Sequence, residues 1–255
     1  MSWPIWMQGA RLSELLATVP YKGDVWRLVE AQHRISTLKL VDSLQEQALL
    51  EKMLEETKPS MPPECEGLDY LLAAPFRYAP YPKGSRFRRA GKTDGVFYAS
   101  EKVETAIAEL SFYRLLFFAE SPLTAFPDAP TDFSAFSVAV KTGALLDLSQ
   151  PAHSDLALSD LVNYEACQSL ADRARKIKAS AIRYASVRDP RKGFNMALLT
   201  PRAFAAKKPK AWQTWRIKIG PHGVSALCDF PQARISFDRT TFSADPRLAD
   251  FRWQR

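Results

Sequence analysis

The pattern of apolar and polar residues predicts helices in the first sixty residues of the chain and strands toward its end. In the stretch "DVWRLVEAQHRIST", Trp26, Val29 and His33 recur at spacings of three and four residues. This spacing is typical of one face of an α-helix. We therefore expect a helix that begins near Asp24.

A second helix is predicted directly after the first. Ser43 and Glu46 have the spacing of a capping box, and the helical pattern continues to Lys58. The segment "KPSMPPECEG" that follows contains three prolines and a glycine, which end a helix. We therefore expect an N-terminal helical extension at residues 1–60 and a second domain at residues 61–255.

A strand, a helix and another strand are predicted next. After a proline-broken loop or short strand, "LLAAPFRYAPYPKGSRFRRAG", the stretch "GVFYAS" indicates a short strand, and Ser100 can cap the helix "EKVETAIAELSFYRLLFFAE". The stretch "FSAFSVAVKT" alternates apolar and polar residues as a strand does. The expected core-facing stripe of the helix consists of Val103, Ala106, Ile107, Leu110, Tyr113 and Phe117.

The last hundred residues are predicted to contain one helix and then mostly strands. The helix lies around "LSDLVNYEACQSLADRARKI", and the strands are "SAIRYAS", "NMALLT", "WQTWRIKIG", "GVSALCDF" and "ARISFDR". Long helices early and several strands late favour an α+β fold over a regular βαβ array. We expect a mixed or antiparallel sheet core.

Composition indicates a globular chain with a polyanionic partner. The 255 residues are 46% hydrophobic and 25% charged, which excludes extensive disorder, and the net charge is +7. This charge suits a nucleic acid, a nucleotide or an acidic protein. Cys65, Cys167 and Cys228 are far apart and odd in number, so we expect no disulfide framework and a reducing, cytoplasmic compartment.

Several sequence signals are missing. The first residues, "MSWPIWMQGARLSELL", lack the basic start and apolar core of a signal peptide, and we expect no membrane span. The histidines have no metal-ligand spacing, so we expect no metal site. Neither GxGxxG nor GxxxxGK[ST] occurs, so arginines would have to hold the phosphates of any bound nucleotide.

The stretch "GSRFRRAGKTDGVFYASEKVETAIAEL" holds the candidate chemistry. Arg86 lies in its loop and Arg77 shortly before it, and a guanidinium offers paired donors that match phosphate oxygens. Tyr98 offers a flat ring for stacking and a hydroxyl. Glu109 has Ala106 and other largely apolar neighbours on its helix, an unusual setting for a carboxylate.

The order and spacing of five motifs resemble the RES domain, a family named for arginine, glutamate and serine. The resemblance covers about residues 70–205, and "WRLVEAQHRISTLKLVDS" resembles an extension found in some members. "GSRF" replaces the family's usual "GGRW". The matching motifs are "FR" at Arg77, "GSRF" at Arg86, "VFYAS" at Tyr98, "AIAEL" at Glu109 and "YASVR" at Ser186.

The resemblance implies an ADP-ribosyltransferase-like fold and the toxin half of a bacterial toxin-antitoxin pair. The implied substrate is NAD⁺, which such a toxin cleaves between nicotinamide and ribose with water or phosphate. The implied partner is an Xre-type helix-turn-helix antitoxin, and nucleic acid is contacted only through that partner. Transfer of ADP-ribose to a cellular protein is the alternative reaction.

The resemblance also implies a role for each matched residue. Glu109 would stabilise the positive charge that develops on the ribose. Arg77 and Arg86 would hold the pyrophosphate, and Arg77 and Tyr98 would belong to the catalytic group. Tyr98 would also pack on the nicotinamide or its ribose, and Ser186 would hydrogen-bond the substrate or an arginine.

A non-catalytic nucleic-acid-binding protein is a second class of function. The stretch "RAFAAKKPKAWQTWRIKIG" interleaves basic residues with Trp212 and Trp215, which can stack on bases. The same residues also suit an exposed basic loop followed by a core strand, because "WRIKI" alternates as strands do.

Overall fold

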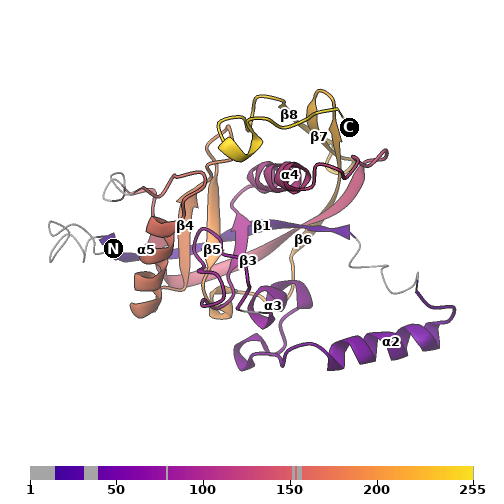
Figure 1. Ribbon diagram of the computed structural model, residues 1–255. Helices are drawn as coiled ribbons and strands as arrows, with labels where there is room; N and C mark the ends of the chain where they lie inside the picture. The colour runs from indigo at the N-terminus through magenta and orange to yellow at the C-terminus, as the bar shows by residue number, and fades with distance from the viewer. Residues whose placement is uncertain (1–14, 32–39, 79, 151–152, 154–156, 255) are drawn as a thin grey trace.

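Eight strands form one mixed sheet, and helices lie on both sides of it (Figure 1). The computed structural model describes residues 15–31, 40–78, 80–150, 153 and 157–254. The strands are β1 (Thr18–Glu30), β2 (Phe97–Ser100), β3 (Thr131–Asp147), β4 (Ala181–Ala185), β5 (Phe194–Leu198), β6 (Ala211–Gly220), β7 (Gly223–Cys228) and β8 (Ala233–Asp238). The helices are α2 (Leu44–Glu56), α3 (Tyr70–Arg77), α4 (Val103–Glu120) and α5 (Glu165–Lys176), with short 3₁₀ turns at Pro63–Cys65, Pro201–Ala203 and Pro246–Leu248.

The first five strands close on themselves. The sheet order is β1-β2-β5-β4-β3-β6-β7-β8, and β1 also pairs with β3, so β1, β2, β5, β4 and β3 form a ring of neighbours. The pairing of β3 with β4 is parallel and the others are antiparallel. Val25, Phe97, Met196 and Leu198 of these strands belong to one buried cluster. This closed half of the sheet gives the site its rigid base.

The outward face of β2, β5 and β4 carries a row of polar side chains. Ser100 pairs directly with Asn195, and Asn195 with Tyr184. Side chains of directly paired residues point to the same face of a sheet, so these three lie side by side. Tyr98, two residues before Ser100, shares that face because strand side chains alternate.

Helices α4 and α5 pack against different parts of the sheet. Helix α5 buries Cys167 and Leu170 in a cluster with Ile182 and Ala197 of the outward face. Helix α4 contributes Phe112 and its neighbours to the cluster that covers β6, β7 and β8. The polar row therefore lies between the region covered by α5 and the region covered by α4, as the positions of α5, β4, β5 and α4 in Figure 1 indicate.

The helix expected near Asp24 is wrong. Residues 18–30 form β1, which pairs with β3 from Thr18 opposite Leu146 to Glu30 opposite Phe133. Its side chains divide between two cores: Trp26 and Leu28 pack on one and Val25 on the other. That division follows strand alternation, and the long partner strand lies over a hundred residues away, beyond any local pattern. His33 lies outside the described residues.

The second N-terminal helix is confirmed as α2. Ser43 is its N-cap, and its hydroxyl oxygen accepts the backbone N–H of Glu46 at 3.1 Å. The Glu46 carboxylate in turn accepts the N–H of Asp42 at 2.9 Å. The region before residue 60 therefore contains a sheet strand as well as a helix, and it is not a purely helical extension.

Two details of the central region differ from expectation. The proline-rich loop contains α3, which Asp69 caps by accepting the N–H of Leu71 at 2.9 Å. In α4, Tyr113 and Phe117 are 50% and 52% exposed, because the helix buries Phe112 and its neighbours against the sheet instead. The predicted stripe was correct for Ala106 and Ile107, which are buried, and wrong for Tyr113 and Phe117.

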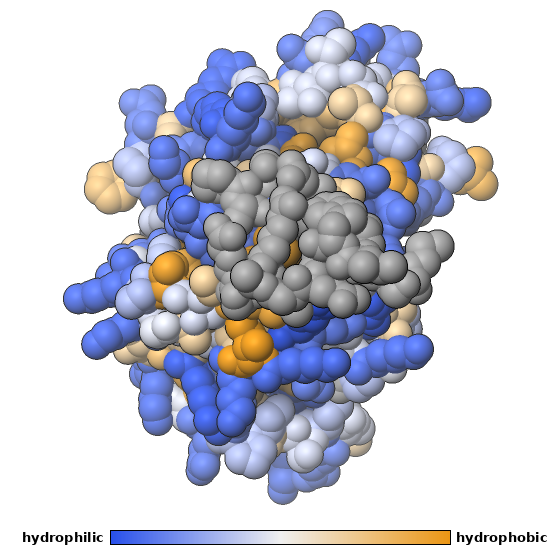
Figure 2. All heavy atoms as spheres, turned by 90° about the vertical axis from the view of Figure 1, so that its left-hand side faces the viewer, coloured by the Kyte–Doolittle hydropathy of each residue, from blue (hydrophilic) through white to orange (hydrophobic). Residues whose placement is uncertain are grey.

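The remaining predicted elements are confirmed as β2, α4, β3, α5 and β4 to β8, so the α+β assignment with a mixed sheet holds. No helix among the described residues is both long and apolar enough to cross a bilayer. The face that carries α5 is mostly hydrophilic where its placement is described, with a few scattered apolar side chains (Figure 2).

Candidate active site

The carboxylate of Glu109 is held by two side chains from the sheet. The Ser186 hydroxyl donates to Glu109 Oε1 at 2.7 Å, and the Asn195 amide Nδ2 donates to the same oxygen at 2.6 Å. No described residue donates a hydrogen bond to Oε2. The two donors fix the plane of the carboxylate, and its second oxygen is left available to a ligand.

Each of the two donors is itself held in place. The Ser100 hydroxyl donates to Asn195 Oδ1 at 2.6 Å, so the amide is oriented by a donor on one side and an acceptor on the other. Ser186 Oγ accepts the backbone N–H groups of Arg188 at 3.2 Å and Asp189 at 3.0 Å. Ser100, Ser186 and Asn195 are all buried, so water does not compete for these hydrogen bonds.

Two tyrosines, Tyr113 and Tyr184, lie within electrostatic reach of this carboxylate. Burial, followed by the negative charge of Glu109, raises the pKa of Tyr184 well above its ordinary value. At the half-exposed Tyr113, partial burial, the neighbouring Tyr164 and the charge of Glu109 raise the pKa, and Tyr98 also acts on both groups. These hydroxyls therefore stay protonated at neutral pH and can donate hydrogen bonds to an anion or a sugar oxygen.

Tyr98 ties the arginine-bearing loop to β2. Its hydroxyl lies 2.9 Å from Ser85 Oγ and accepts the backbone N–H of Phe87 at 3.1 Å. Burial raises the pKa of Tyr98. Below it, Arg27 of β1 lies 4.8 Å from the Phe97 ring and donates to the Tyr98 carbonyl at 3.3 Å. Burial lowers the pKa of Arg27 to about 10.

Arg86 is buried on the same side and binds a loop of the chain. It donates to the carbonyl oxygens of Leu158 at 2.6 Å and Asp160 at 2.9 Å. The guanidinium carbon also lies 4.7 Å from the centre of the Tyr164 ring. Arg86 and Tyr98 both act electrostatically on Tyr184, as Glu109 does, so these residues share one region.

Arg77 lies elsewhere. It donates to Glu55 Oε1 at 2.5 Å and to the Pro59 carbonyl at 2.6 Å, and it is only 7% exposed. In Figure 1, α3 and α4 lie on opposite sides of the strands. The structure thus brings Arg86, Tyr98, Glu109 and Ser186 into one region, and it does not bring Arg77 there.

A buried ion pair next to the site was missed from the sequence. Arg188 Nη1 lies 2.8 Å from Asp245 Oδ2, and the Arg188 guanidinium carbon lies 3.8 Å from the Phe112 ring centre. Arg188 and Arg247 both donate to the Leu161 carbonyl, at 2.6 and 3.0 Å. Asn195 was missed as well, although a lone amide in an apolar strand could have marked it as a site residue. Asp245 had a weaker signal, because it lies far along the chain from the predicted motifs.

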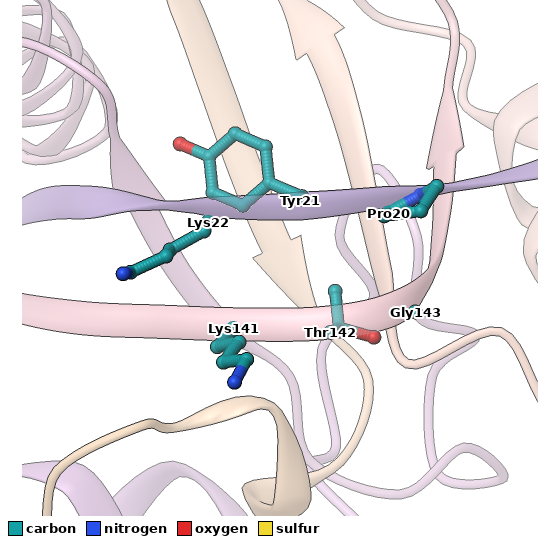
Figure 3. A pocket seen from close by; sticks show the side chains of 6 residues that line it. All are labelled: Pro20, Tyr21, Lys22, Lys141, Thr142 and Gly143. Atoms are coloured by element: carbon teal, nitrogen blue, oxygen red, sulfur yellow. The ribbon is translucent and has the colours of Figure 1, made fainter.

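Two hollows in the described part of the chain are not lined by Glu109. One, of about 600 Å³, is lined by Pro20, Tyr21, Lys22, Lys141, Thr142 and Gly143 (Figure 3). The other, of about 620 Å³, is lined by Ala157, Ser159, Asp160, Leu161, Val162, Asn163 and Pro246. The second lies beside the segment that holds Arg86 and Arg188. Within the described ranges, no group of three or more histidine, cysteine or acidic residues could hold a metal ion.

Comparison with known proteins identifies the central part of the chain. A model of the RES domain matches residues 61–219. No curated protein is similar enough to count as a relative. A chain in the crystal structure of the M.tuberculosis MbcT-MbcA toxin-antitoxin complex is similar to this chain, with a TM-score of 0.48 and 11% identity over 82% of this chain and 93% of that chain.

Proposed function

We propose that this chain, which belongs to the RES domain family, is a toxin that cleaves the bond between nicotinamide and ribose in NAD⁺ at Glu109, on an ADP-ribosyltransferase-like fold. The observation that carries the proposal is the pair of hydrogen bonds from Ser186 and Asn195 to one oxygen of Glu109. Its second oxygen would accept from the ribose hydroxyls. No metal is needed, and the partner would be an antitoxin of the Xre type.

The fixed carboxylate suits the charge that this reaction develops. As the bond to nicotinamide breaks, the ribose acquires oxocarbenium character and therefore positive charge. A carboxylate already fixed by Ser186 and Asn195 needs no reorganisation to stabilise that charge, so it favours the transition state over the ground state. Nicotinamide leaves as a neutral molecule, so the reaction needs no strong general acid.

The surrounding tyrosines suit the cationic ring of NAD⁺. The nicotinamide ring of the oxidised dinucleotide carries a positive charge, which is attracted by the faces of aromatic rings. Tyr98, Tyr113, Tyr164 and Tyr184 lie within electrostatic reach of one another or of Glu109. A neutral, reduced nicotinamide ring would lose this attraction, so the site would prefer NAD⁺ to NADH.

Arg86 is the arginine that we assign to the pyrophosphate. Its donors now point to the carbonyl oxygens of Leu158 and Asp160, and carbonyl oxygens occupy the places that phosphate oxygens would take. Binding of the pyrophosphate would therefore displace the segment 157–164. Arg77 is not part of this proposal, because it binds Glu55 and Pro59 at the end of α3, which lies on the opposite side of the strands from α4 (Figure 1).

Incubation of the purified full chain with NAD⁺ tests the proposal. Chromatography would follow free nicotinamide and identify its companion product. ADP-ribose would indicate hydrolysis, and a phosphorylated ADP-ribose formed only in phosphate buffer would indicate phosphorolysis. ADP-ribose that stays bound to protein would indicate transfer. Nicotinamide release by the wild-type chain but not by Glu109→Gln supports the proposal, and no release by either overturns it.

The nucleic-acid alternative rests on a stretch in which one of the two tryptophans is too buried to stack on a base. Trp212 is 42% exposed, whereas Trp215 is 1% exposed and belongs to the core. The second half of the stretch forms the strand β6, with Arg216 and Lys218 on its exposed side. Binding of RNA or DNA that weakens steeply with salt, without NAD⁺ cleavage, would favour this alternative.

A further inference from the structure

Helix α2 exposes the face that helices normally bury. None of its thirteen residues is buried. Leu49, Leu50, Met53 and Leu54 have the i, i+1, i+4, i+5 spacing of one helix face. Leu49 is 58% exposed, Met53 55% and Leu54 43%. We call these four residues the helix stripe.

The rest of α2 is oriented by a contact on its other face. Glu55 lies on the side opposite the helix stripe, and it is Glu55 that meets Arg77 at 2.5 Å. The polar face of α2 therefore contacts the body of the protein through Glu55, whereas Leu49, Met53 and Leu54 of the helix stripe are exposed and Leu50 is partly buried. In water a helix of this length is marginal without a packed face, which indicates that α2 docks on a partner.

A second exposed face lies on β6, β7 and β8. Helix α4 covers one side of these strands. On the other side, Arg216 pairs directly with Leu227, and Leu227 with Arg234, so a leucine lies between two arginines in one row. Leu227 is 41% exposed, and Arg216 and Arg234 are exposed as well. We call this row, with the neighbouring Lys218, the basic row.

The two faces have opposite charge. Glu51 and Glu56 lie at the two edges of the helix stripe, and α2 as a whole carries four glutamates and one lysine in a chain of net charge +7. Arg216 is bridged by Asp229, whereas neither Lys218 nor Arg234 has an ion pair with any described residue. The helix stripe, with a glutamate at each edge, is thus complementary in charge to the basic row, in which Leu227 lies between two arginines.

The two faces also match in size. A thirteen-residue helix is about 20 Å long and about 10 Å wide. The strands β7 and β8 have six residues each, about 20 Å, and the outer two of three strands lie about 10 Å apart. In Figure 1, α2 extends away from β7 and β8 of its own chain. The helix stripe, Leu227 and Arg234 lie outside residues 61–219, the part shared with the family, whereas Arg216 and Lys218 lie inside it.

We propose that α2 of one copy docks its helix stripe on the basic row of a second copy. Such a contact joins two different patches of the same chain, so it repeats head to tail and gives a ring or an open chain of copies. Apolar contact between the stripe and Leu227 supplies the centre of the interface, and the charged edges fix its register. The proposal is independent of the reaction at Glu109.

Paired charge reversals test this docking in the full chain. The helix variant is Glu51→Lys with Glu56→Lys, and the row variant is Arg216→Glu with Arg234→Glu. Light scattering after size exclusion would measure mass from about 1 to 100 µM protein, the range in which interfaces of modest size dissociate. Glu120→Lys with Asp128→Lys is the control, because it changes net charge as the helix variant does, at two exposed residues outside α2 and the basic row.

The wild type and the control should associate with rising concentration, and salt at about 0.5 M should weaken this association because it screens exposed charge. Each variant alone should associate at least about tenfold more weakly. An equal mixture of the two should recover the association, because the positive edges of the helix variant's stripe then face the negative row of the row variant. A monomeric wild type overturns the proposal. Variants that associate like the wild type, or a mixture that stays monomeric, overturn it as well.

Discussion

Two buried arginines meet carboxylates in different ways in this protein. The side chain of Arg188 is 4% exposed and that of its partner Asp245 is 1% exposed. The side chain of Arg77 is 6% exposed, but that of its partner Glu55 is 53% exposed. A buried charge that loses its partner cannot turn to water, whereas an exposed one can. The region beside Glu109 is therefore held by a fully buried ion pair. The contact between α2 and α3, which we call the α2–α3 corner, is held more loosely.

The largest expected effect comes from Asp245→Asn. This change leaves the Arg188 guanidinium buried without its counter-charge, and we expect the free energy of unfolding to fall by about 3–5 kcal/mol. Urea denaturation followed by circular dichroism would measure it. Glu55→Gln is the matched change at the other pair. It should cost far less, because Arg77 keeps its hydrogen bond to the Pro59 carbonyl and water reaches the exposed position 55. Equal losses for both variants would contradict the comparison.

Acid should weaken the same pair. Burial alone would raise the pKa of Asp245, but hydrogen bonds from Arg247 and the charge of Arg188 hold it below its ordinary 3.8. The unfolded chain therefore takes up this proton at a higher pH than the folded chain does. The stabilisation is complete above about pH 4 and is lost as the pH falls through the lowered pKa.

Denaturation at several pH values below 5 would measure this loss in the wild type and in Asp245→Asn. The difference in stability between the two chains should shrink as the pH falls. A difference that stays constant with pH would show that Asp245 does not titrate differently in the folded and unfolded chains.

A smaller effect is expected from the residue that orients Glu109. Asn195→Ala removes one of the two hydrogen bonds to Oε1, and we expect kcat for nicotinamide release to fall about ten- to hundredfold with little change in KM. Ser100→Ala leaves the amide in contact with Glu109 and should cost less. An Asn195→Ala chain with the wild-type kcat would exclude this positioning role.

Asn195→Asp sharpens the same prediction through pH. It would set a second carboxyl group where the amide now lies 2.6 Å from Glu109 Oε1. Two carboxylates this close share a proton, so the pH below which activity is lost should rise. An unchanged pH profile would mean that residue 195 does not contact Glu109 in the active protein.

The smallest effect is expected at the loosely held corner. Arg77→Gln should lower the free energy of unfolding by about 1 kcal/mol, because its partner glutamate is exposed. Amide hydrogen exchange should speed up in α2 and stay unchanged in β2 and β5. A large loss of NAD⁺ cleavage without a change in exchange would place Arg77 at the substrate instead.

Local patterns predicted much of this fold. The capping pair Ser43 and Glu46 predicted the start of α2, and alternation predicted the strands from β2 onward. Local patterns failed for β1, whose identity depends on pairing with the distant β3. They also failed for α3, where Asp69 and the tertiary packing outweigh the prolines.

The candidate site was predictable only in part. The order of motifs named Glu109 and Ser186, and the structure brings the two within 2.7 Å. The surroundings of each arginine were not predictable. Arg77 and Arg86 have similar burial, but one binds a glutamate of α2 and the other binds carbonyl oxygens of a loop far along the chain. Such partners follow from the assembled sheet and not from sequence spacing.

The most direct measurement is the single-turnover rate of nicotinamide release from saturating NAD⁺, with the affinity for NAD⁺ measured in parallel, for the wild type and Glu109→Gln. If Glu109 stabilises the charge that develops on the ribose, the rate should fall about 10²–10³-fold while the affinity stays within a few-fold. A variant that releases nicotinamide at the wild-type rate would contradict the account.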